Sequence, residues 1–217
     1  MKIKSFQGGY DNNLCYVLSC EQTKICAIVD PSVEINPVLE YIESNNLILD
    51  KILITHSHHD HVLYLDDYIN LFPLVKVYVS EKASMKGSID YIGVEHNEII
   101  SVGEILVLSL LTPGHYFDSV CFWIKKEKIV FTGDTMFVGR TGRTISSGSN
   151  IEDLYNSTYN ILLKLPMKTT ILPGHHYGFS KSISLFENKK FSIFFQCKSF
   201  NEFKIVMEKF EKSRKSQ

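Results

Sequence analysis

The sequence predicts a single α+β domain, and three observations support this class. Strand-like runs occur in both halves of the 217-residue chain, and each half also has helical patterns of its own. With 44% hydrophobic and 22% charged residues, the composition is that of a globular protein with a substantial core. No repeat of solenoid period and no low-complexity linker divides the chain. We therefore expect residues 1–217 to form one domain, with a short helical tail over about 180–217.

Strands predominate in the first half of the chain. Apolar and β-branched runs predict strands at residues 2–6, 13–19, 24–29, 51–55 and 75–79. Apolar residues at helical spacing predict helices at residues 37–42 and 62–72, the second of which ends before Pro73. The third strand ends at Asp30 and Pro31, where a strand-end turn is a sufficient explanation for the aspartate.

The second half has the same mixture of strands and helices. Apolar runs predict strands at residues 104–111, 120–124, 129–132 and 169–172. The two middle strands are expected to form a hairpin that turns at residues 125–128. Residues 151–165 have the clearest amphipathic helical pattern and are stopped by Pro166, and residues 200–210 predict a terminal helix.

Charge and cysteine content exclude several function classes. The net charge of -1 argues against nucleic-acid binding driven by bulk charge. No apolar run approaches the roughly 20 residues that span a bilayer, and no apolar signal region follows the N-terminal lysines. The five cysteines have no CxxC spacing, which indicates buried free thiols. We expect a cytoplasmic protein without a nucleic-acid or membrane partner.

Most of the histidines fall in three short segments, each of which follows a predicted strand. Seven of the eight lie there: His56, His58, His59, His61, His115, His175 and His176. A fourth predicted strand leads directly to Asp134. So many buried imidazoles would make a poor core, because each polar ring needs a partner. The pattern therefore predicts a metal site at the ends of these strands.

The spacing of the first segment predicts ligands for a first ion. In an extended loop, residues i and i+2 point the same way, so His56 and His58 can bind one ion. His115 would complete that set. Neutral imidazole combined with a few carboxylates favours zinc or iron over calcium or magnesium.

The remaining ligands predict a second ion beside the first. Asp60 and His61 lie just beyond the first pair and can reach this second ion, which His175 would complete. Asp134 is the natural bridge between the two ions, because a carboxylate has two oxygens and a neutral imidazole has one free lone pair. Two neighbouring cations can lower the pKa of a shared water and stabilise the anion that forms after its attack.

Four motifs in this order resemble the metallo-β-lactamase superfamily. They are His56-x-His58-x-Asp60-His61, Thr112-Pro113-Gly114-His115, Phe131-Thr132-Gly133-Asp134-Thr135 and Pro173-Gly174-His175. The resemblance runs from about Gly8 to about Phe195 and fills all seven expected ligand positions. It implies a four-layer αββα sandwich with the metal ions at the edge where the two sheets meet.

Within the superfamily, the chain resembles short glyoxalase II enzymes, the hydroxyacylglutathione hydrolases, and the related persulfide dioxygenases. Residues 133–144 and the tail at 187–195 carry this resemblance. It implies hydrolysis of a glutathione thioester such as S-lactoylglutathione by hydroxide on two divalent ions, with zinc first and iron or manganese as the other candidates. Asp60 and Asp134 would be the catalytic residues, Asp60 both as a ligand and as the group that orients the attacking water.

Two alternatives stay open beside the thioester hydrolase. A persulfide dioxygenase would use a single iron at His56, His115 and Asp134, a two-histidine, one-carboxylate set with open positions for oxygen. A metal-binding protein without catalysis is the third reading, although no ligand position is missing. A true β-lactamase is disfavoured because such enzymes carry cysteine at the position of Asp134.

The substrate-binding candidates are Arg140, Arg143 and Tyr177. Two of only three arginines flank one loop beside the predicted metals, and arginine binds carboxylates such as those of glutathione in a bidentate manner. Arginines exposed there by chance are the open alternative. The chain departs from the family at Tyr116-Phe117, where small residues are usual, and at Ile145, where aspartate is common. It also ends before the glutathione-binding helical domain of long glyoxalase II enzymes.

Overall fold

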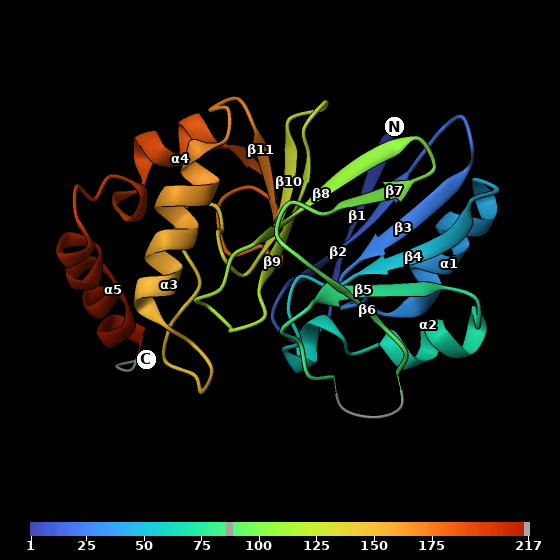
Figure 1. Cartoon of the computed structure of the whole chain (residues 1–217), viewed down its shortest axis with the longest axis horizontal. Helices are drawn as coiled ribbons and strands as arrows, with labels where there is room; N and C mark the ends of the chain where they lie inside the picture. Colours follow the sequence, from blue (N-terminus) through green and yellow to red (C-terminus); the bar gives the residue numbers. More distant parts are fainter. Residues whose placement is uncertain (86–88, 215–217) are drawn as a thin grey trace.

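The computed structural model describes residues 1–85 and 89–214. In this part of the chain the strands form two sheets that face each other, with helices covering the outer face of each sheet (Figure 1). This arrangement is the αββα sandwich that the sequence resemblance implied. The last three residues of the predicted C-terminal tail, 215–217, lie outside the described residues.

The first sheet comes from the N-terminal half of the chain. Its strands lie in sequence order: β1 (Lys2–Gly8), β2 (Asn13–Ser19), β3 (Ile25–Val29), β4 (Ile48–Leu53), β5 (Lys76–Ser80) and β6 (Ile92–Val94). The first three strands pair antiparallel, whereas β3 to β6 pair parallel. The carboxyl ends of β3 and β4 therefore meet at the same edge, where the histidine-rich segment begins.

The second sheet comes from the C-terminal half. It has the order β12-β11-β10-β9-β8-β7, with β7 (Ile99–Val102), β8 (Ile105–Leu111), β9 (Val120–Ile124), β10 (Ile129–Gly133), β11 (Thr170–Pro173) and β12 (Ile183–Ser184). The predicted hairpin is confirmed by the antiparallel pairing of β9 with β10. The sequence did not predict β6, β7 and β12.

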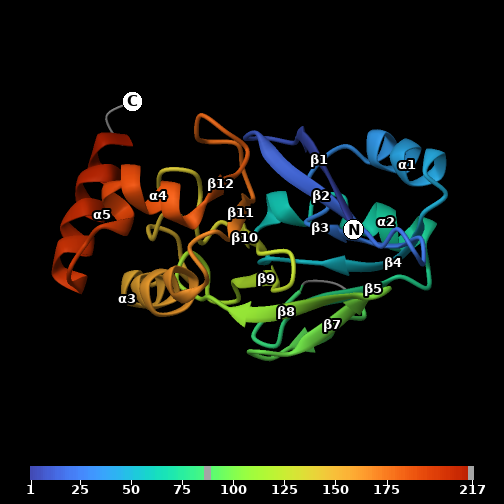
Figure 2. The ribbon, with the colours of Figure 1, turned by 90° about the horizontal axis from the view of Figure 1, so that it is seen from above.

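The helices form the two outer layers (Figure 2). Helices α1 (Ile35–Ser44) and α2 (Leu65–Leu71) cover the first sheet, and α3 (Ile151–Asn156), α4 (Leu185–Phe191) and α5 (Phe200–Arg214) cover the second. The predicted helix at 151–165 is confirmed, although it continues after α3 as a π-helical turn (Ser157–Ile161) and a 3₁₀ turn (Leu162–Lys164). Helix α4 lies within the tail at about 180–217 that was expected to be helical, but its own bounds were not predicted from the sequence.

Three apolar clusters fill the three interfaces between the four layers. One packs α1 and α2 on the first sheet, one lies between the sheets, and one packs α3, α4 and α5 on the second sheet. The expectation of free thiols is confirmed, since all five cysteines are unpaired and only Cys197 is not fully buried. Among the described helices, none combines the length and hydropathy that a membrane span requires.

Backbone hydrogen bonds join the two sheets at one edge of the sandwich. The amide of Leu14 at the start of β2 donates to the carbonyl of Gly174 after β11, at 2.7 Å. The amide of Val120 in β9 donates to the carbonyl of Thr55 after β4, at 2.8 Å. The loops that carry the predicted ligands leave the sheets at this same edge.

Candidate metal centre

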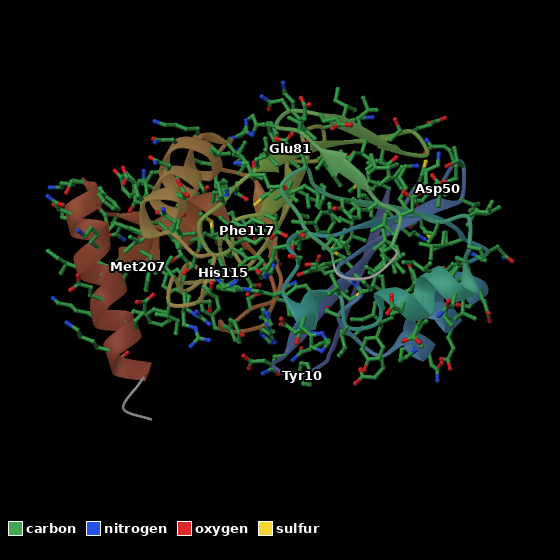
Figure 3. The ribbon with its side chains drawn as sticks, turned by 60° about the horizontal axis from the view of Figure 1, so that its bottom comes forward. Tyr10, Asp50, Glu81, His115, Phe117 and Met207 are labelled. Carbon is green, nitrogen blue, oxygen red and sulfur yellow. The ribbon has the colours of Figure 1, made fainter. Side chains whose placement is uncertain are left out.

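The seven predicted ligands converge at the edge where the two sheets are joined. Their potential ligand atoms lie within 4.8 Å of one another in a first group of His56, His58 and His115 and in a second group of Asp60, His61 and His175. An overlapping set of His56, His61 and Asp134 links the two groups. In Figure 3, which turns this edge toward the viewer, His115 lies near the middle of the molecule and Tyr10 at its lower margin. The loops after β4, β8, β10 and β11 supply the whole set.

The first group has three imidazole nitrogens facing one point. His56 Nε2 lies 3.0 Å from His58 Nδ1, and His115 Nε2 lies 3.1 Å from the same nitrogen. Two nitrogens bound to one zinc ion at about 2.0–2.1 Å lie roughly 3 Å apart, so these separations suit a shared cation. His58 is the most open of the three, because His56 and His115 are 2% and 9% exposed.

The second group combines two imidazoles with a carboxylate. His61 Nε2 lies 3.2 Å from His175 Nε2, and Asp60 Oδ2 lies 3.3 Å from His175 Nε2 and 3.6 Å from His61 Nε2. Both histidines are buried, whereas the side chain of Asp60 is 28% exposed. The centre therefore opens to solvent at His58 and Asp60.

Asp134 lies between the two groups. Its Oδ2 is 3.5 Å from His115 Nε2 and 3.4 Å from His175 Nε2, and its Oδ1 is 3.2 Å from His61 Nε2. Oδ1 is buried yet makes no hydrogen bond of good geometry within the described residues. A buried carboxylate oxygen needs a partner, and a cation at this point would supply one.

Outer hydrogen bonds orient three of the imidazoles. The Nδ1 atom of His61 bonds to Asp30 Oδ2 at 2.8 Å, that of His175 to the Asp11 carbonyl at 2.9 Å, and that of His115 to the Arg143 carbonyl at 2.9 Å. Carbonyl and carboxylate oxygens accept, so each Nδ1 carries a proton and Nε2 is the nitrogen that can bind a metal at the centre.

Asp30, Asp11 and Asn13 are functional candidates that the sequence prediction missed. The interpretation of Asp30 as a simple turn residue is wrong, because its buried carboxylate also binds His61 and accepts from the Thr55 amide and hydroxyl at 2.7 Å each. The fully buried Asn13 donates to Asp60 Oδ2 at 2.8 Å. One signal was available for Asp30, since its strand ends at the edge that carries the ligands.

The electrostatics of the centre favour a cation. Burial lowers the pKa of His61 and His175, but the Asp134 carboxylate outweighs it and raises the pKa of His61 well above its ordinary value and that of His175 to about 9. Burial would raise the pKa of Asp134, yet the charges of His175 and His61 hold it well below its usual range. In the first group burial prevails and lowers the pKa of His58 to about 4, which keeps the neutral form that binds metal.

The backbone of the loop after β11, which carries His175, lies directly against the other candidate ligands. A Cβ atom at Gly174 would lie 2.5 Å from both Asp134 Oδ1 and His61 Cε1, so only glycine fits there. Together with the converging lone pairs and the unpartnered Asp134 oxygen, this packing fits two divalent ions held by imidazole and carboxylate groups.

The three predicted substrate-binding residues lie at different positions around the centre. Arg143 is exposed, and only its backbone carbonyl contacts the centre, through His115. Tyr177 stacks on His175 with ring centroids 4.7 Å apart and donates to Asp11 Oδ2 at 2.5 Å. The guanidinium of Arg140 lies 4.3 Å from the Tyr177 ring centroid.

The residues that depart from the family pattern flank the open side. The ring of Tyr116 lies against His58, with centroids 4.2 Å apart, and Phe117 beside it is 38% exposed. His59 points outward as predicted, with Tyr10 near it at 6.2 Å. His176 contacts Gln7 at 3.3 Å and is not among the grouped ligands.

Comparison with known proteins identifies relatives of two kinds. The family model described as the metallo-beta-lactamase superfamily matches residues 8–175. The Schizosaccharomyces pombe protein named "Probable hydroxyacylglutathione hydrolase glo2" is 37% identical over 85% of this chain and 71% of its own length. The Bacillus velezensis protein named "Probable polyketide biosynthesis zinc-dependent hydrolase BaeB" is 30% identical over 88% and 85%.

A solved structure with the same architecture covers nearly the whole chain. ETHE1 from Myxococcus xanthus is 28% identical, with a TM-score of 0.87 over 96% of this chain and 90% of that one. The family match spans all seven candidate ligands, from His56 to His175, and ends before β12, α4 and α5.

Proposed function

Because the chain belongs to the metallo-β-lactamase superfamily, we propose that this enzyme is a metal-dependent hydrolase of glutathione thioesters of the S-lactoylglutathione type. The observation that carries the proposal is the convergence of seven candidate ligands at a single edge, combined with 37% identity to a protein named as a hydroxyacylglutathione hydrolase. The name of the zinc-dependent relative supports zinc as the first candidate metal.

Two divalent ions would be held by residues already described. His56, His58 and His115 would hold one ion, Asp60, His61 and His175 the other, and Asp134 would contact both. When bound, such ions lower the pKa of a water molecule and stabilise negative charge on the carbonyl oxygen of the substrate.

The chain's own groups orient the reactants. Asp60 is the most exposed carboxylate of the centre. Burial opposes its ionisation, but the hydrogen bond from His175 and the charge of His61 outweigh burial and lower the pKa of Asp60. Asp60 is therefore ionised at neutral pH and can accept a hydrogen bond from the attacking water. Asn13 fixes its Oδ2 atom. Arg143, exposed on the adjacent loop, can bind a carboxylate of the glutathione group while the thiolate leaves.

Hydrolysis and metal content together test the proposal. Protein loaded with two zinc ions is expected to release thiol from S-lactoylglutathione, and His58→Ala or Asp134→Asn to abolish that activity while the circular dichroism spectrum is kept. Near-wild-type activity of a folded, metal-loaded variant would refute the assigned roles. Absence of thioester cleavage by the protein with two bound metals would refute the function itself.

The second candidate is a persulfide dioxygenase with one iron. The observation in its favour is that His115 Nε2 and Asp134 Oδ2 lie 3.5 Å apart, and that each of these residues shares a group of potential ligand atoms with His56. The three residues can therefore supply a two-histidine, one-carboxylate set. Metal analysis of protein purified without oxygen or added metal separates the two. Two metals per chain support the hydrolase, whereas a single iron and oxygen uptake with glutathione persulfide support the dioxygenase.

A further inference from the structure

The loop at residues 137–144 contacts both groups of candidate ligands. On one side, the Arg143 carbonyl accepts the hydrogen bond from His115 Nδ1, at 2.9 Å. A Cβ atom at Gly142 would collide with the Asp134 carbonyl and lie 2.8 Å from His115 Nδ1, so the loop backbone lies directly against the centre. On the other side, Arg140 stacks on Tyr177, whose ring lies parallel to that of His175 with an angle of 7° between them.

The segment that follows β12 fastens the first part of this loop. We call residues 185–214, which include α4, a 3₁₀ turn (Ile193–Phe195) and α5, the C-terminal brace. The buried Asn188 donates to the Phe137 carbonyl at 2.9 Å and accepts from the Gly139 amide at 2.8 Å. Ser192 donates to the Gly139 carbonyl at 2.7 Å. These bonds satisfy backbone groups that the irregular loop cannot pair by itself.

One face of α5 fastens the second part of the loop. The Thr141 hydroxyl donates to Met207 Sδ at 3.2 Å, and the Phe210 ring centroid lies 5.1 Å from the Arg140 guanidinium. Glu211 Oε1 accepts from the Thr144 amide at 2.9 Å and from its hydroxyl at 3.2 Å. Residues 207, 210 and 211 share one face of the helix because they are three and four positions apart.

We propose that the C-terminal brace positions the first group of ligands, with Glu211 as its main positioning residue. Glu211 holds Thr144, the neighbouring Arg143 carbonyl holds the Nδ1 proton of His115, and His115 Nε2 is thereby aimed at His58 and Asp134. A hydrogen bond of this outer kind fixes the tautomer and orientation of a histidine ligand. The inference rests on the proposed metal centre but is independent of which substrate is cleaved.

The test compares two glutamates on the same helix. Glu211→Ala removes the acceptor of Thr144, whereas Glu208→Ala removes a 60% exposed glutamate whose ion pair with Lys212 measures 3.8 Å. Because Glu211 acts on His115 through the loop backbone, we expect Glu211→Ala to weaken zinc binding by up to about 10-fold, less than the loss of a direct partner of a ligand. It should also change the visible spectrum of the cobalt-substituted protein. Glu208→Ala should leave both unchanged. Glu211→Gln keeps an acceptor oxygen for Thr144 and should restore the wild-type spectrum.

The outcomes separate this inference from the proposed function. A wild-type spectrum and affinity in Glu211→Ala would overturn the positioning role while leaving the hydrolase proposal intact. Failure of the wild-type protein to bind metal would instead refute the proposed function. If Glu211→Ala does not fold, Thr144→Val removes only the hydroxyl bond and is expected to shift the cobalt spectrum in a smaller degree; an unshifted spectrum would then overturn the inference.

Discussion

Replacing Asp30 by asparagine is expected to weaken zinc binding because it changes which nitrogen of His61 carries the proton. Asparagine has nearly the same shape as aspartate, so the packing should change little. The Thr55 amide can only donate, so the asparagine oxygen must take the position of Oδ1, which accepts that bond at 2.7 Å. The new NH₂ group then faces His61 Nδ1, 2.8 Å from the atom that it replaces. His61 keeps a hydrogen bond only by accepting, and its proton moves to Nε2, the nitrogen that faces the centre.

The magnitude follows from the bond that metal binding must then break. A metal at His61 Nε2 forces the proton back to Nδ1, where it faces the NH₂ group of the new asparagine. The hydrogen bond between these two side chains is then lost at a buried position, since Asp30 is 2% exposed. Leaving a buried donor without an acceptor costs about 1–3 kcal/mol, which corresponds to a loss of about 5- to 150-fold in zinc affinity.

A competition titration with a fluorescent zinc chelator measures this change. Asp118→Asn is the matched control, because Asp118 is also buried, at 1% exposure, and accepts from the Ser57 amide at 3.2 Å, a bond that an asparagine oxygen can keep. We expect the zinc affinity of the control to stay near that of the wild type. Equal zinc affinity and stoichiometry in Asp30→Asn and the wild type would refute the assigned tautomer of His61.

Three further predictions concern the same edge of the molecule. Since the pKa of His175 is raised to about 9, zinc must displace its proton at pH 7.5, and zinc affinity should fall as the pH falls. Calorimetry in two buffers with different protonation enthalpies measures this proton release, and its absence would contradict the prediction. Gly174→Ala places a Cβ atom 2.5 Å from Asp134 Oδ1 and His61 Cε1. Elemental analysis should therefore find fewer than two metal ions per chain, whereas full occupancy would show that the loop backbone can shift to accommodate alanine. Arg143→Ala should raise KM for a glutathione thioester more than it lowers kcat in steady-state assays; an unchanged KM would remove Arg143 from the binding site.

The convergence of the candidate ligands could be predicted from the sequence because each lies close to a strand end. His56, His115, Asp134 and His175 follow β4, β8, β10 and β11, and the strand ends of packed sheets bring such residues to a common edge. The long helix pattern and the hairpin were equally readable, since both depend on local periodicity.

The groups that orient the ligands could not be predicted in this way. Asp30 contacts a residue 31 positions away, Asn13 one 47 positions away, and Asp11 one 164 positions away. The Asp11 and Arg143 contacts use backbone carbonyls, for which no side-chain pattern exists in the sequence. The spacing of residues thus predicts which side chains can share a metal centre. The packing of the two sheets decides which other groups hydrogen-bond to those side chains.

The hydrogen bonds between Leu14 and Gly174 and between Val120 and Thr55 have a consequence for how the protein unfolds. The first sheet supplies His56 to His61, the second supplies His115, Asp134 and His175, and the core between the two sheets is apolar. Metal ions bound there would cross-link the two halves reversibly. Each bound ion would add RT ln(1 + [M]/Kd) to the free energy of unfolding, where [M] is the free metal concentration. With metal, both sheets should unfold in one transition. After a chelator has removed the metal, the two sheets should separate first at this edge.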